Sequence, residues 1–207
     1  MSTERRTYTK RRRAEAEQAT RQRITEAAVE LHGSVGPART TISAVADRAG
    51  VQRATVYRHF PDEEALFAAC SGHWAAANPL PDPGTWQEIA DHPERLRRAL
   101  ADLYSFYRSN EAMLENVTRD RPFVEAMAKP AAAMLAYFEV VIETIVAGRP
   151  ERGHARRRVK AAVGHATSFG AWQSLVRQHG LDDSEAAAMM AAMVEATRSV
   201  GGSAPRP

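Results

Sequence analysis

The sequence lacks the features that mark several classes of protein. Cys70 is the single cysteine among 207 residues, so no disulfide can form within the chain. No apolar run approaches the roughly 18–20 residues needed to cross a bilayer. The start of the chain is polar and basic, without the apolar stretch of a secretory signal. These absences favour a cytoplasmic protein with no membrane partner.

Signatures of catalysis and of metal binding are missing as well. The sequence has no Gly-x-Ser-x-Gly elbow, no phosphate-binding glycine loop and no His-Glu-x-x-His pair. The seven histidines are scattered and suggest no metal site. We therefore expect that the protein is not an enzyme and needs neither a metal ion nor a cofactor.

No alternating pattern of useful length predicts a β-strand, whereas helical spacing recurs along the chain. Ile24, Ala27, Ala28 and Leu31, for example, follow the i, i+3, i+4, i+7 pattern of one helical face. Helices are predicted over about 15–32, then from a cap at Thr40-Thr41 to Gly50, over 52–60, from Asp62 and from Pro93. Further helices are predicted over 111–120, 122–147 (kinked or interrupted by Pro130), 154–179 and 183–199. The predicted fold class is all-α.

Composition divides the chain into four regions. Residues 1–13 carry six basic and few apolar side chains and are predicted to be a disordered arm. Three prolines in residues 78–84 forbid a regular helix and predict a linker or a long loop. We therefore expect one folded region over 14–75, a second, helical region over 76–200, and a disordered tail over 201–207.

Positive charge is concentrated at one end of the chain. Residues 1–60 hold 12 Lys and Arg against 6 Asp and Glu, whereas residues 61–207 hold 16 against 19. A basic end beside a nearly neutral remainder favours a polyanionic partner. A solvated basic tail is the alternative that charge alone leaves open.

The stretch from Thr40 to Leu66 has the spacing of a helix-turn-helix. Two short helices are joined by Ala49-Gly50-Val51, where Gly50 allows the left-handed conformation of a tight turn. The second helix of such a motif lies in the major groove of DNA. Its polar residues suit contacts to base edges and phosphates: Gln52, Arg53, Thr55, Tyr57, Arg58 and His59.

Two runs carry a resemblance to a known family. Thr41-Ile42-Ser43-Ala44-Val45-Ala46-Asp47-Arg48-Ala49-Gly50-Val51 is followed by Ala54-Thr55-Val56-Tyr57-Arg58-His59-Phe60 and by Glu64-Ala65-Leu66. Over about residues 20–70 the sequence resembles the N-terminal domain of TetR-family repressors. The remainder resembles that family only in length and helical character.

The resemblance implies roles for individual residues. Thr41 would bind a phosphate, Thr55, Tyr57 and His59 would clamp the DNA backbone, and Gln52, Arg53 and Ala54 would face base edges. Arg53 is the strongest candidate for guanine recognition. Glu63 departs from the family, which usually has Lys at the start of the fourth helix. We expect the basic arm to compensate for the lost cation.

In this family the C-terminal region binds a small molecule and forms a dimer. The resemblance therefore implies a DNA-binding domain over 14–75 and an effector-binding and dimerisation domain over 76–200. Residues at helical spacing are candidates for its pocket, although each is also explained as core: Tyr104, Tyr107, Met113, Met134, Phe138, Phe169 and Trp172. His165, Gln173 or Tyr107 would supply its polar groups. Small residues over 154–179 and 183–199 would let these helices pair with those of a second copy. Closure of the core of a single chain is the alternative.

These expectations together describe a homodimeric repressor. It would bind double-stranded palindromic operator DNA and be released by a small-molecule effector. A DNA-binding architectural protein without an effector is the alternative, and a helical enzyme is a remote one.

Overall fold

The computed structural model describes residues 2–198, with side chains from Thr7 onward. The described residues contain helices and no strand, which confirms the all-α prediction. They fall into two compact units. Unit 1 holds the described residues up to Pro79 together with Ala112–Ala131, and unit 2 holds Leu80–Glu111 with the described residues from Ala132 onward. The predicted tail over 201–207 lies outside the described residues.

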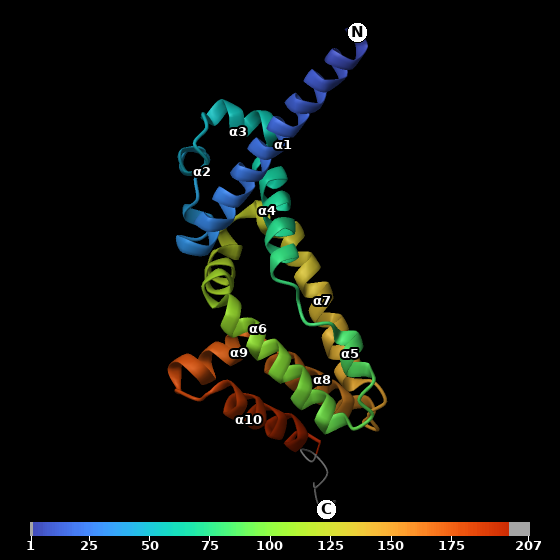
Figure 1. Cartoon of the computed structure of the whole chain (residues 1–207). Coiled ribbons are helices and arrows are strands. Elements are labelled where there is room, and N and C mark those ends of the chain that lie inside the picture. Colours follow the sequence, from blue (N-terminus) through green and yellow to red (C-terminus); the bar gives the residue numbers. More distant parts are fainter. Residues whose placement is uncertain (1, 199–207) are drawn as a thin grey trace, which may run out of the picture. The chain divides into compact units, whose positions relative to one another are not determined.

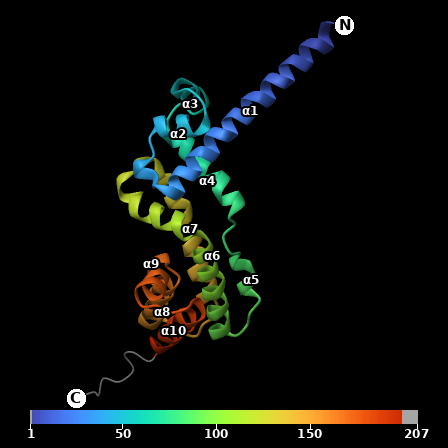
Figure 2. The same ribbon diagram turned by 60° about the vertical axis from the view of Figure 1, so that its left-hand side comes forward.

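Unit 1 is built around the helix-turn-helix. Its N-terminal elements are α1 (Ser2–Ser34), the 3-10 turn η1 (Pro37–Arg39), α2 (Ile42–Ala49), α3 (Arg53–His59) and α4 (Glu63–Ala77). Helix α1 packs against α2 and α4, and α2 packs against α3 (Figures 1 and 2). Their apolar faces form one core, which includes Ile24, Ala28, Val45, Val56, Phe60, Leu66 and Cys70.

Local caps fix the ends of these short helices. The Thr41 hydroxyl accepts a hydrogen bond from the Ala44 amide (3.1 Å), and Asp62 Oδ1 accepts one from the Ala65 amide (2.7 Å). Gly50 ends α2 with φ 65° and ψ 40°, the left-handed conformation predicted from the sequence. The predicted cap at Thr40-Thr41 falls on Thr41, and the predicted cap at Asp62 is confirmed.

The basic N-terminal segment differs from the predicted disordered arm. Helix α1 begins at Ser2, so the described part of the segment continues the helix that packs in unit 1. Neither Gly nor Pro occurs before Gly33, and Arg11 pairs with Glu15 one turn later (2.8 Å). Helix-forming residues therefore extend a helix that is already nucleated by its packed half.

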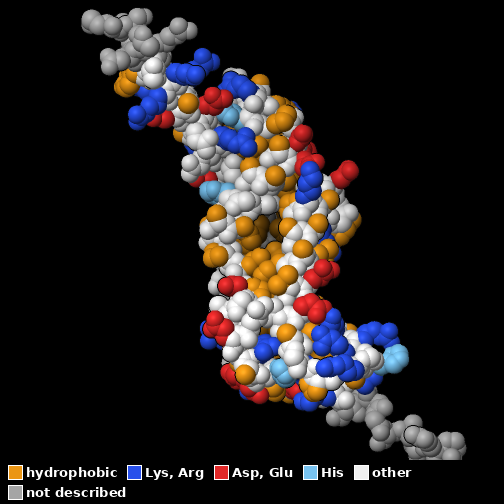
Figure 3. Space-filling model, turned by 90° about the vertical axis from the view of Figure 1, so that its right-hand side faces the viewer, with side chains coloured by type: hydrophobic (Ala, Val, Ile, Leu, Met, Phe, Trp, Pro, Cys, Tyr) orange, Lys and Arg blue, Asp and Glu red, His pale blue; other side chains and the backbone are white. Residues whose placement is uncertain are grey.

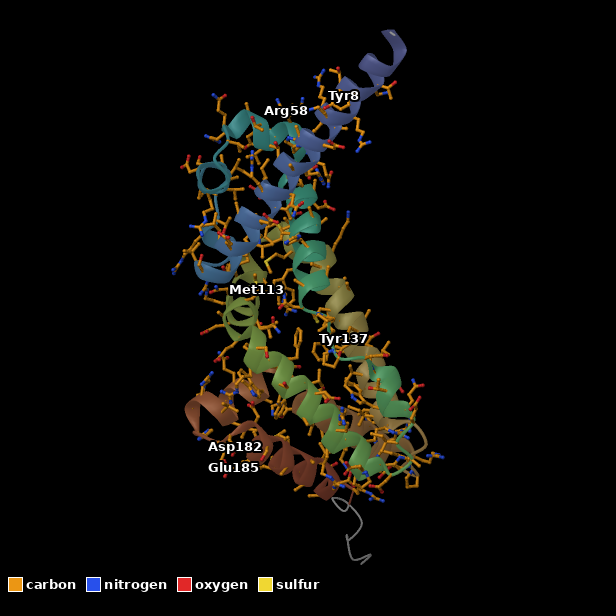
Figure 4. The ribbon with its side chains drawn as sticks, in the orientation of Figure 1. Tyr8, Arg58, Met113, Tyr137, Asp182 and Glu185 are labelled. Carbon is orange, nitrogen blue, oxygen red and sulfur yellow. The ribbon has the colours of Figure 1, made fainter. Side chains whose placement is uncertain are left out.

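Unit 2 consists of helices that precede and follow Ala112–Ala131 in the sequence. They are α5 (Pro83–Gln87), α6 (His92–Asp120) up to Glu111, α7 (Ala128–Val146) from Ala132, α8 (Gly153–Ala166), α9 (Phe169–Gln173), the π-helical turn η4 (Ser174–Gln178) and α10 (Asp183–Ala196). Asp182 and Glu185, labelled in Figure 4, form a reciprocal capping box at the start of α10.

Several helix boundaries differ from the predictions. Helix α5 begins inside the predicted linker, because Asp82 caps a turn that Pro83 is able to start. Turns η2 (Arg121–Phe123) and η3 (Glu125–Met127) replace the start of the predicted 122–147 helix. Pro130 interrupts nothing, since it lies in the first turn of α7. The predicted 154–179 helix is divided where Ser168 caps α9.

The predicted break before residue 111 is present within α6. Asn110 has non-helical angles (φ −121°, ψ 15°), and its side chain donates to the Phe106 carbonyl (2.9 Å). In the described part of the chain, none of the helices is both long and apolar enough to cross a membrane.

Candidate nucleic-acid interface

Helix α3 is held in place by its buried face. Val56 and Phe60 have almost no exposed surface. Arg21 of α1 places its guanidinium 4.1 Å from the centre of the Phe60 ring and donates to the His59 carbonyl (2.5 Å). The orientation of α3 is thereby fixed against α1. Helical spacing does not indicate this role for Arg21, because Arg21 lies 38 residues before His59.

The opposite face of α3 and the residue before it are exposed. This face carries most of the residues predicted to bind DNA: Gln52, Arg53, Ala54, Tyr57 and Arg58. Tyr57 has 47% of its surface exposed, a large value for an aromatic residue within a packed unit. Arg58 is labelled on α3 in Figure 4. Two cations, an amide and a phenol therefore share one solvent-facing surface, as groove contacts require.

The remaining predicted DNA contacts differ in accessibility. Thr41 is exposed at the start of α2, while Thr55 and His59 are half-buried. His59 Nε2 is buried and has no hydrogen-bond partner within the described residues. A contact of His59 with DNA would therefore use the other ring nitrogen. Glu63 is exposed in the first turn of α4.

The basic residues at the start of the chain lie on the same unit. Lys10, Arg11, Arg12 and Arg13 are exposed on α1, and Figure 3 shows Lys and Arg side chains around the part of this helix next to the grey residues. Arg12 lies 5.9 Å from the centre of the Tyr8 ring. The positive charges of this helix are exposed to solvent and are therefore accessible to the phosphates of a DNA backbone.

Four of the predicted ligand-binding residues form an aromatic cluster in unit 2. Phe169 stacks on Trp172 with ring centres 5.5 Å apart, and Tyr107 meets Phe169 edge-on at 5.6 Å. Tyr104 lies 6.2 Å from Tyr107. Tyr104, Tyr107 and Trp172 are buried, and burial raises the pKa of both phenols above their usual value.

The polar atoms of this cluster are satisfied within unit 2. Tyr104 donates to the Ala166 carbonyl (2.9 Å) and Tyr107 to the Thr167 carbonyl. The Trp172 indole donates to Asp183 Oδ1 (2.8 Å). The cluster is therefore packed as core in this structure, with no free polar group on these three rings to orient a ligand.

The other predicted ligand-binding residues do not join that cluster. Met134 and Phe138 are half-buried on α7, and His165 is exposed on α8. Phe138 packs against Tyr137, which is labelled in Figure 4. The Tyr137 hydroxyl donates to the Pro81 carbonyl (2.8 Å). Met113, also labelled there, belongs to unit 1.

Two cavities found among the described residues are not lined by the predicted ligand-binding residues. A depression in unit 2 is lined by Pro150, Glu151, Glu195 and Arg198. A second cavity lies in unit 1, where sequence analysis expected no ligand. No group of three or more His, Cys, Asp or Glu among the described residues is arranged to hold a metal ion.

Comparison with known proteins identifies the N-terminal region. Residues 24–70 match the model of the bacterial regulatory proteins of the tetR family. These residues form a TetR-family DNA-binding domain. The match covers the α2 and α3 surface described above and ends at Cys70 in α4, so it confirms the resemblance predicted from the sequence.

Solved TetR-like structures share the fold of the chain. NalD of Pseudomonas aeruginosa, the secondary repressor of the MexAB-OprM efflux pump, is 21% identical with a TM-score of 0.62, covering 88% of this chain and 97% of NalD. A TetR-like regulator from Rhodococcus sp. RHA1 is 17% identical with a TM-score of 0.63, covering 89% and 97%. FadR of Bacillus subtilis, solved with stearoyl-CoA, is 20% identical with a TM-score of 0.56, covering 86% and 97%. No curated protein matches the chain.

Proposed function

We propose that the protein is a homodimeric transcriptional repressor that binds a palindromic operator and is released by a small-molecule effector. The exposed face of α3 is the observation that supports this most directly, because it lies within the TetR-family domain. Arg53 and Gln52 stand at the start of α3, the part of a recognition helix that enters the major groove. Tyr57 and Arg58 follow one turn later, where they suit phosphate contacts.

The requirement for a dimer follows from the size of this surface. One helix of seven residues reads few base pairs, whereas two copies read two half-sites. Met189 and Met193 of α10 are exposed one turn apart (43% and 51%). Exposed apolar side chains on a helix of small residues favour packing against a second copy. Helix α8 adds the exposed Ala161 to the residues available for this contact.

The effector is proposed to act through unit 2. NalD is a repressor and FadR was solved with stearoyl-CoA, which supports the pairing of DNA binding with a ligand in this fold. A ligand between the aromatic rings would have to displace internal contacts such as Tyr107 to Thr167. Release from DNA then requires that the ligand bind more tightly to the form with lower operator affinity.

Replacing Arg53 is expected to weaken operator binding. Loss of one good base contact costs about 1–3 kcal/mol, or roughly 5- to 150-fold in Kd. An operator is first enriched from random duplexes, and affinities are then measured by fluorescence anisotropy at fixed salt for wild type, Arg53→Ala and Tyr57→Phe. The control is Arg97→Ala, an exposed arginine of unit 2.

The enriched sequence decides between the two DNA-binding hypotheses. A palindrome that Arg53→Ala binds more weakly, while Arg97→Ala binds it normally, supports the repressor. Salt-sensitive binding without enrichment, and with equal affinity for wild type and Arg53→Ala, contradicts it and leaves an architectural protein.

Deleting residues 1–13 is expected to flatten the salt dependence of operator binding. Each lost phosphate contact reduces the slope of log K against log salt by roughly 0.9. The slope is measured for wild type, the deletion variant and Arg157→Gln, which removes an exposed positive charge from unit 2. An equal slope for all three would show that the basic segment does not touch DNA.

A further inference from the structure

Unit 1 contains a cavity that neither the family match nor the proposed effector explains. Its volume is about 400 Å³, within the usual range of roughly 300–1,000 Å³ for small-molecule sites. Its walls come from the end of α1, η1, α2, the start of α4 and the segment with η2 and η3. These segments all belong to unit 1.

The cavity has an apolar floor and an exposed rim. Val45 and Leu66 of the floor are buried, and Phe67 lies beside them. On the rim, Phe123 has 80% of its surface exposed, the largest value among the exposed large apolar residues described. A ligand with an apolar body would cover the Phe123 ring and contact the floor, which removes apolar surface from water.

The charged groups on the lining have one sign. Glu63 and Glu125 line the cavity, and neither Lys nor Arg does. Neither carboxylate forms an ion pair in the described part of the chain, whereas the adjacent Glu64 pairs with Lys129. Unpaired carboxylates beside an apolar surface attract a cation whose body is apolar.

His32 adds an unused hydrogen-bonding group to the floor. It is 6% exposed and stacks on Phe67 with ring centres 4.6 Å apart. Within the described residues, no hydrogen bond to a ring nitrogen of His32 is found. Burial lowers the pKa of His32 to about 4, so the ring is neutral at pH 7 and one nitrogen is free to accept a hydrogen bond.

The wall beside His32 is held rigidly. Asn116 donates to the carbonyls of His32 (3.1 Å) and Gly33 (2.9 Å). Asp120 accepts from the Ala38 amide of η1 (3.0 Å) and pairs with Arg119 (2.7 Å). Arg119 is therefore neutralised by its own partner, and these hydrogen bonds form the wall before any ligand binds.

We propose that this cavity binds a small organic cation with an aromatic or branched apolar body. The apolar body would lie between Phe67 and Phe123, and the cationic group would donate hydrogen bonds to Glu63 or Glu125. Glu63 thereby gains a role where the TetR family usually has Lys. This site is separate from the effector site proposed for unit 2 and does not depend on it.

Three probes of matched shape test the proposal: 1-naphthylmethylammonium, 1-naphthalenemethanol and 1-naphthoate. They differ mainly in charge, and their binding to the full chain is measured by isothermal titration calorimetry without DNA. We expect the ammonium to bind roughly 10-fold or more tightly than the alcohol, a difference of about 1.4 kcal/mol. The carboxylate should bind most weakly, because Glu63 and Glu125 repel it.

Variants locate the bound probe. In Glu63→Gln/Glu125→Gln the ammonium should bind no more tightly than the alcohol. The control is Glu17→Gln/Glu115→Gln, which changes two exposed residues of unit 1 away from the lining. This control should keep the wild-type preference for the ammonium. Phe123→Ser should weaken both probes. Absence of saturable ammonium binding, or an unchanged preference in Glu63→Gln/Glu125→Gln, overturns the proposal. Operator binding is measured separately with the Arg53→Ala variant, so that a failure of this proposal and a failure of the proposed function are distinguishable, although Thr41 lines the cavity and is also a predicted DNA contact.

Discussion

Replacing Gly36 by Ala is expected to lower the free energy of unfolding by about 3 kcal/mol. Gly36 lies between α1 and η1 with φ 95° and ψ 156°. Residues with a side chain are almost never found in this conformation, and forcing one into it costs about 1–3 kcal/mol before any contact is considered.

Overlap of the added Cβ atom with two neighbouring side chains further increases the free-energy cost of Gly36→Ala. A Cβ atom there would overlap Arg119 Nη2 and Asp120 Oδ2. Asp120 has little freedom to retreat, because it is buried and accepts the hydrogen bond from the Ala38 amide. Moving it would break that bond and disturb its pairing with Arg119.

The matched control is Gly50→Ala. Gly50 also has a positive φ (65°), but a Cβ atom there would have no neighbour within 4 Å. The backbone alone should then cost about 1 kcal/mol. Urea unfolding followed by circular dichroism compares both variants with wild type. An equal loss at the two glycines would mean that the Arg119–Asp120 pair does not hold η1 as the structure shows.

The exposed face of α3 was predictable because its determinants are local. The caps at Thr41 and Asp62 act within three residues, and Gly50 ends a helix by its own conformational freedom. Once those ends are fixed, helical spacing alone decides that Val56 turns inward and Tyr57 outward. The exposed face of α3 follows from these short-range rules.

The unit 1 cavity and the aromatic cluster depend on contacts that helical spacing does not reveal. Asp120 reaches Ala38 across 82 residues, and Tyr104 reaches Ala166 across 62. A period of 3.6 marks an apolar face but does not distinguish a packed core from the lining of a pocket. Tyr104 and Tyr107 were therefore reasonable ligand-binding candidates, although the structure satisfies both hydroxyls internally.

His32 is expected to make unit 1 less stable in acid. Burial lowers its pKa to about 4, against the opposing attraction of Asp120, whereas the value in an unfolded chain is about 6.5. The unfolded state therefore binds the proton more tightly, and between these two values stability falls as the pH falls. From pH 7 to about pH 4.5 this single group should remove about 2 kcal/mol.

Other groups also change the stability in acid, so the effect of His32 is measured as a difference. Asp120, for example, has its pKa lowered by the hydrogen bond from Arg119 and loses that stabilisation only in stronger acid. His32→Phe keeps a ring stacked on Phe67 but has no group that titrates. Urea unfolding is compared at pH 7 and pH 4.5 for wild type, His32→Phe and His73→Gln, an exposed histidine of the same unit.

The loss of stability between the two pH values should be about 2 kcal/mol smaller in His32→Phe than in wild type. His73→Gln should follow wild type. If His32→Phe lost as much stability in acid as wild type, His32 would have to be protonated at the same pH in the folded and unfolded chains. That result would contradict a desolvated ring, and the floor of the unit 1 cavity would then be open to water.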